Sequence, residues 1–245
     1  MQKITAGNVV SDALKRCDEG NWVGALRDIS GLIECTAKAE HGVGGKKVFK
    51  EWVEANTRLI MAVTTDGRLG VERLNIKMEH RDIQTVDGSA PFPDIVHHAI
   101  RCALAHDGLN PEMVEFTGNR IGSSVAGGPI CLLSSVVTGL VLAVLGSAVH
   151  ADQKLPMPWT IGVGPVVLDL QRFWGKGEEL FDAFRYAVNV AYRPISSQPS
   201  RLTKPQEGLL RKRVLLEGRN VKRAARPMSP ISLAERAGFE PAGGN

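Results

Sequence analysis

Paired cysteines are absent from this 245-residue sequence. Its four cysteines, Cys17, Cys35, Cys102 and Cys131, form neither a CxxC pair nor the Cys/His spacing of a zinc site. This pattern argues against a disulfide framework and a zinc site, and it favours a reduced setting. The N-terminal segment MQKITAGNVVSDALKR also lacks the apolar core and cleavage site of a signal peptide. We therefore expect a cytoplasmic protein with no metal and no cofactor.

A domain-wide excess of basic charge is absent too. The net charge of +4 comes from residues 194–245, which hold ten Lys or Arg and four Asp or Glu, a net +6. The other 20 basic and 22 acidic residues give residues 1–193 a net −2, without the basic footprint typical of nucleic-acid binding. We expect a folded domain over 1–193 and a basic, disordered tail over 194–245. The final segment, LAERAGFEPAGGN, resembles the product of a reading frame that runs across a transfer-RNA gene.

Charged residues are missing altogether between Ile121 and His150. The run at 130–149 is long enough to cross a bilayer. Its serines, threonine and two glycines, with no aromatic belt at its ends, favour instead a helix buried in the core of a bundle. We expect the buried helix, and keep membrane attachment as the less favoured alternative.

Hydrophobic periodicity predicts a mainly helical fold. In residues 47–63, for example, Phe49, Trp52, Val53, Ile60 and Val63 recur on one face of a helix. Residues 64–91 contain the turn pairs Asp-Gly and predict turns with a short strand near 69–76. The predicted helices span 7–18, 21–37, 47–63, a segment from Pro93 to His106, and 176–192, with a turn-rich stretch and a short strand in the segment PMPWTIGVGPVVLDL.

The segment AIRCALAHDG places Arg101 and His106 in an R-x4-H arrangement at the predicted end of a helix. The motif follows a GNW-x-x-AL start at 20–26 and an F-x-x-W-V helix at 49–53, and it precedes a very apolar helix and an F-W-G-K segment. In this order the sequence resembles the HEPN superfamily over residues 8 to 193. The resemblance implies a HEPN-like antiparallel helical bundle with short irregular or β-hairpin insertions.

The resemblance also implies a metal-independent endoribonuclease, in which His106 is the acid/base and Arg101 binds the scissile phosphate. These residue types suit the reaction, because histidine titrates near neutrality and a guanidinium stabilises charge on phosphoryl oxygens. A five-residue separation, however, puts the two side chains roughly 140° apart around one helix. We therefore expect a homodimer in which two such helices face each other across a two-fold axis.

Neighbouring residues leave a rival interpretation open. His97 and His98 precede Arg101 by four and three residues, so they approach its face of a helix and are candidates for phosphate binding. Cys102, however, stands where many active members have a polar residue after the arginine. The rival is a catalytically inactive HEPN-like module that binds a partner. In the nuclease interpretation, the expected partners are RNA and an antitoxin or regulatory protein. The mixed charges at 79–82 are read as solvated surface without a role.

Overall fold

The computed structural model describes residues 5–68, 70–80, 82–105, 114–118, 121–122, 128–163 and 165–191, and for 101–105 it describes the backbone. All of them belong to one compact unit, Met1–Tyr192. The predicted tail over 194–245 lies outside the described residues.

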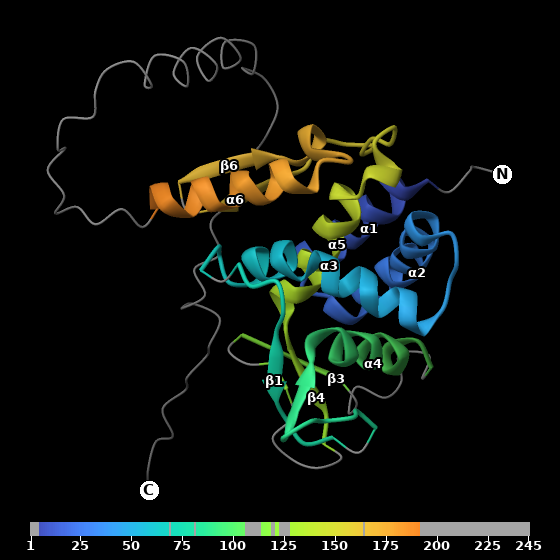
Figure 1. The fold of residues 1–245 in the computed structure, drawn as a ribbon. Helices are drawn as coiled ribbons and strands as arrows, with labels where there is room; N and C mark the ends of the chain where they lie inside the picture. The colour runs from blue at the N-terminus through green and yellow to red at the C-terminus, as the bar shows by residue number, and fades with distance from the viewer. Residues whose placement is uncertain are drawn as a thin grey trace, which may run out of the picture. The chain divides into compact units, whose positions relative to one another are not determined.

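The described part of the chain is mainly helical, which confirms the predicted fold class (Figure 1). Three short two-stranded sheets accompany the helices. The helices are α1 (Ala6–Asp18), α2 (Trp22–His41), α3 (Lys46–Thr64), α4 (Phe92–Ala105), α5 (Ser134–Gly146) and α6 (Gly177–Ala191). The strands are β1 (Asn75–Lys77), β2 (Ser89–Pro91), β3 (Val114–Thr117), β4 (Ile130–Leu133), β5 (Thr160–Val163) and β6 (Val166–Asp169), with 3-10 turns at Ala148–His150 and Leu170–Phe173.

Helix boundaries follow local signals in the sequence. Thr5 caps α1 by accepting a hydrogen bond from the Asn8 amide, and the Asn21 side chain caps α2 by accepting one from the Gly24 amide at 3.0 Å. At the other end of α2, Gly42 adopts a φ of 75°, a left-handed conformation that favours glycine. The predicted helices over 7–18 and 21–37 are therefore present, and the second runs four residues further than predicted.

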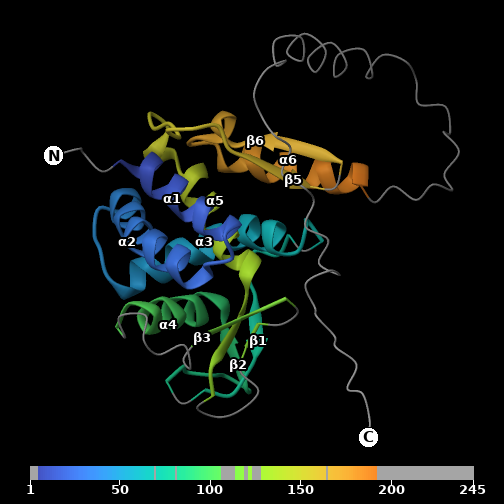
Figure 2. The same cartoon turned by 180° about the vertical axis from the view of Figure 1, so that it is seen from behind.

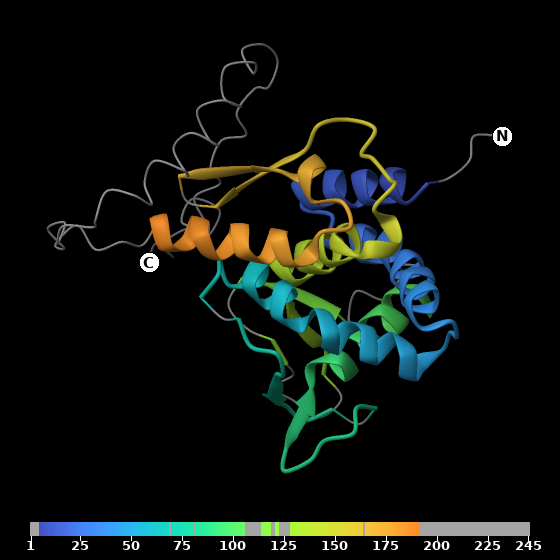
Figure 3. The ribbon, with the colours of Figure 1, turned by 45° about the horizontal axis from the view of Figure 1, so that its top comes forward.

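Helix α5 lies in the middle of the helical layer and packs against α1, α2, α3 and α6 (Figure 3). Its residues from Val136 to Gly146 are almost all buried, and the helix contains no charged residue. With 13 residues it is about 20 Å long, against roughly 30 Å for a bilayer core. None of the helices that the structure describes is long and apolar enough to span a membrane. The prediction of a buried helix is thus confirmed for Ser134–Gly146.

The ends of the predicted apolar helix are wrong. Residues Ile130–Leu133 form β4, which pairs in parallel with β3, so that Val114 lies opposite Ile130. A strand buried on both faces has a continuous apolar sequence, and periodicity alone cannot separate it from a buried helix. The strand predicted near 69–76 also differs, because β1 begins at Asn75 and pairs antiparallel with β2. The expected β-hairpin insertions are found as β1–β2 and β5–β6.

Two hydrophobic clusters hold these elements. The larger one joins α1, α2, α3, α4, α5 and α6, and includes the predicted α3 face of Phe49, Trp52, Val53, Ile60 and Val63. The smaller one lies between α4 and the strands below it (Figure 2). Its buried members are Met78, Ile83, Ala90, Ile95, Ala99, Val114, Ile130 and Leu132.

The cysteines differ sharply in their surroundings, and this difference predicts their reactivity. Cys35 is exposed, whereas Cys17 and Cys131 are buried. Burial raises the pKa of the Cys17 thiol to about 11, and a hydrogen bond with Thr138 offsets only part of this rise. At pH 8 the thiolate fraction of Cys17 is then about one in a thousand.

We therefore expect a thiol reagent to modify Cys35 of the native protein within minutes, and to reach Cys17 and Cys131 only after unfolding. Peptide mapping by mass spectrometry after timed labelling identifies each modified cysteine separately. Labelling of Cys102 therefore does not affect the comparison of the other three. Labelling of Cys17 as fast as Cys35 in folded protein would contradict the buried position of α1.

Candidate functional site

Helix α4 carries most of the residues that the sequence singled out. It begins at Phe92, and Pro93 and Asp94 occupy its first turn, where a proline and an acid are both favoured. Asp94 forms an ion pair with Lys50 of α3. Phe92, Ile95 and Val96 are fully or almost fully buried and fix the helix against its neighbours. The Asp94 carboxylate therefore has its ion-pair partner on α3.

Of the predicted catalytic pair, the structure describes only the backbone of Arg101, in the last turns of this helix. The backbone of Arg101 is helical, and His106 follows directly after Ala105, the last described residue of α4. The Arg101 side chain and all of His106 lie outside the described residues. Their distance from each other, within one chain or across a dimer, stays a prediction.

His97 turns toward α3. Its ring meets the Phe49 ring edge to face, with centroids 5.4 Å apart and an interplanar angle of 70°. It also borders a small pocket of about 100 Å³ together with Glu34 and Lys46. From α4, His97 therefore faces α3 and the loop that joins α2 to α3.

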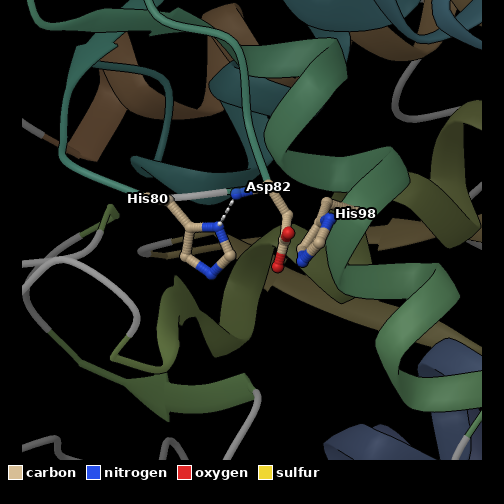
Figure 4. A group of neighbouring side chains, drawn as sticks. All are labelled: His80, Asp82 and His98. Carbon is tan, nitrogen blue, oxygen red and sulfur yellow. Dashed lines mark hydrogen bonds between the residues drawn. The ribbon is translucent and has the colours of Figure 1, made fainter.

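His98 contacts a different element. One residue further along a helix corresponds to a rotation of about 100°, and the His98 ring accordingly meets His80, with centroids 4.8 Å apart. Figure 4 shows the Asp82 carboxylate between these two rings. The structure thus separates His97 from His98, and joins His98 to the loop that follows β1.

The loop is held in place by apolar residues on both sides of the polar ones. Met78 and Ile83 are 4% and 6% exposed and pack with Ile95 and Ala99 of α4 in the smaller cluster. Between them, His80 is 9% exposed. Burying these residues is favourable by roughly 2 kcal/mol for each large apolar side chain, so the core places His80 against α4.

Hydrogen bonds fix the local shape of the loop. The Asp82 amide donates to Nδ1 of His80 at 3.2 Å, and the Ile83 amide donates to the His80 carbonyl oxygen at 3.3 Å. The Asp82 side chain itself is exposed, and His98 is half-buried. Buried His80 therefore anchors the group in the core, and exposed Asp82 lies on its solvent side.

Taken together, His80, Asp82 and His98 offer one ligand atom each, and all three atoms lie within 4.8 Å of one another. A carboxylate among two imidazoles makes this group better suited to a cation than to a phosphate. From the sequence alone, residues 79–82 were interpreted as solvated surface without a role. The available signal was the placement of two potential ligands between the apolar residues Met78 and Ile83, but nothing in the sequence pairs this loop with His98.

A larger hollow lies elsewhere, between α3 and the start of α6. It measures about 850 Å³, and no histidine or cysteine is among its described lining residues. Its charges largely pair with one another, as in Arg58 with Glu178 and Arg73 with Glu54. Size alone would favour this hollow, but the group of two histidines and a carboxylate with converging ligand atoms lies at α4.

A comparison with known protein families finds a match over most of the chain. The model of the family described as Rv1289 matches residues 5–198. No curated protein and no solved structure matches the chain. The match covers all of the described helices and strands, and on this basis the chain belongs to the Rv1289 family.

Proposed function

We propose that the protein is a metal-independent endoribonuclease of HEPN type, acting as a toxin or defence effector. The observation that carries this proposal is the position of Arg101 near the C-terminal end of α4, with His106 directly after the described helix. A histidine at that end of a helix faces the negative end of the helix dipole, which favours its protonated form and hence proton donation. Arg101 supplies the cation that stabilises charge on the phosphoryl oxygens.

The proposal includes a homodimer. Because the two side chains diverge by roughly 140° on one helix, two copies of α4 related by a two-fold axis would bring Arg101 of one chain toward His106 of the other. The RNA would then bind across this interface. An antitoxin or regulatory partner would act by covering it.

The second candidate is a catalytically inactive binding module on the same fold. Cys102 in place of a polar residue and the net charge of −2 over residues 1–193 favour it. So does the acidic neighbour of His98, since Asp82 weakens any phosphate site that this histidine would help to form.

Cleavage of total cellular RNA by the full-length protein in EDTA tests the proposal. We expect wild-type protein to cleave, and Arg101→Ala and His106→Ala to lose about 100-fold or more of the rate, the usual contribution of acid–base groups. Arg27→Ala and His41→Ala are matched controls, because both residues are exposed on α2. They should cleave like the wild type.

Equal cleavage by all five proteins would point to a contaminating nuclease and sink the proposal. Absence of cleavage by a folded, dimeric wild-type protein would favour the inactive binding module.

A further inference from the structure

We infer that His80, Asp82 and His98 form a binding site for a divalent first-row transition metal ion. The site joins the loop after β1 to helix α4, one helical turn before Arg101 (Figure 4). The inference does not rest on the proposed nuclease activity, which requires no metal and involves other residues.

The donor atoms select the class of ion. Two imidazole nitrogens and one carboxylate oxygen suit Zn²⁺, Fe²⁺, Co²⁺ or Ni²⁺, whereas Mg²⁺ and Ca²⁺ prefer oxygen ligands throughout. Two histidines with one carboxylate is a donor set that leaves coordination positions open for water or substrate. The site therefore differs from a closed structural zinc site with four protein ligands.

The distances are close to those of a bound ion. Ligand atoms at about 2.1 Å from a tetrahedral centre lie roughly 3.4 Å from one another, and the three atoms here lie within 4.8 Å. An inward movement of roughly 1 to 1.5 Å closes this difference. We expect this movement at the exposed Asp82 side chain and the half-buried His98 ring, because His80 is held by the core.

Metal binding must also change the hydrogen bonding of His80. Its Nδ1 accepts a hydrogen bond from the Asp82 amide, so a neutral ring in this arrangement carries its hydrogen on Nε2. Coordination through Nδ1 would replace the amide as the partner. Coordination through Nε2 would move the hydrogen to Nδ1, which could then no longer accept. In both cases the ion and the loop conformation are coupled.

The test uses the untagged full-length protein, freed of metal with EDTA and then exchanged into buffer. Co²⁺ is titrated while its visible d–d absorption is recorded, and Zn²⁺ and Mg²⁺ are titrated by calorimetry. We expect one equivalent of Co²⁺ and of Zn²⁺ to bind, no binding of Mg²⁺, and a rise of the melting temperature with Zn²⁺. The nitrogen chemical shifts of His80 should report the change of its ring.

Two pairs of variants make the test specific. Asp82→Asn and His98→Gln remove a ligand at exposed or half-exposed positions, and should weaken Zn²⁺ binding by about 100-fold or more. Asp87→Asn and His97→Gln are their matched controls, one in the same loop and one on the same helix. Asparagine tolerates the φ of 51° at residue 87. Both controls should bind like the wild type.

The inference fails if the wild type binds no Co²⁺ or Zn²⁺, or if the ligand and control variants lose affinity equally. Melting curves recorded without metal show that each variant is folded. Because RNA cleavage is measured in EDTA, loss of metal binding and loss of cleavage identify different failures.

Discussion

Replacing Gly139 with alanine is expected to lower the free energy of unfolding by about 1 to 3 kcal/mol, the usual cost of overpacking a core. Gly139 is the point where α5 approaches α3 most closely among the glycines of the helical core. A Cβ at this position would lie 2.8 Å from the Ile60 carbonyl oxygen and 3.1 Å from the Ile60 Cα. Backbone atoms cannot rotate away, so the two helices must separate.

Gly31 supplies the matched control within the same fold. It also lies in a helix, α2, but it is exposed, and a Cβ there would meet nothing within 4 Å. Gly31→Ala should therefore raise the free energy of unfolding by about 0.5 to 1 kcal/mol through the greater helix propensity of alanine. Urea unfolding followed by circular dichroism measures both effects. Equal effects of the two substitutions would contradict the close packing of α5 on α3.

Removing the Trp52 side chain is expected to have the largest effect of a single core substitution. Trp52 is 0% exposed on α3, inside the larger cluster, and Trp52→Ala should cost about 3 to 5 kcal/mol. Trp52→Phe should cost far less, within about 1 kcal/mol. The indole Nε1 has no hydrogen-bond partner among the described residues. Removing a buried, unpaired donor is favourable, and this gain offsets much of the free-energy cost of the small cavity that phenylalanine leaves.

The same urea unfolding experiment measures this pair. A Trp52→Phe protein as unstable as Trp52→Ala would show that the indole nitrogen forms a stabilising hydrogen bond in the folded protein. Because domains are typically stable by only 5 to 15 kcal/mol, the alanine variant should also show a much lower melting temperature.

Local sequence signals were sufficient for most of the helices. The apolar face of α3 was readable because Phe49, Trp52 and Ile60 repeat with the period of a helix and face one core. The capping residues Asn21 and Gly42 act within a single turn, so their effect depends little on the rest of the fold. The helix predicted at 176–192 agrees with α6, Gly177–Ala191, within one residue at each end.

Strand pairing was not readable to the same extent. Ile130–Leu133 is apolar on every face, as is α5 directly after it, so the sequence contains no change of period where the strand ends. What separates them is the partner strand, Val114–Thr117, which provides the hydrogen bonds of the parallel pair. Such a partner acts across the fold, and the sequence of β4 alone does not contain it.

For the candidate site, too, the sequence predicted the positions of residues on a helix but not their contacts across the fold. Helix periodicity put His97 and His98 on α4 near Arg101, and this placement on the helix is what the structure shows. It did not reveal that His97 meets Phe49 while His98 meets His80. Residues 79–82 were interpreted as solvated charge, yet the burial of Met78 and Ile83 turns His80 toward α4.

By itself, the sequence determined that this protein is built mainly of helices, where most of them begin and end, and that an uncharged segment lies in its core. These properties arise from neighbours within one or two turns. The tertiary structure decided that part of this segment is a strand, and that His80, Asp82 and His98 meet. Both depend on residues distant in sequence, which come together because burying apolar side chains such as Ile83 and Ile95 fixes how a loop packs on a helix.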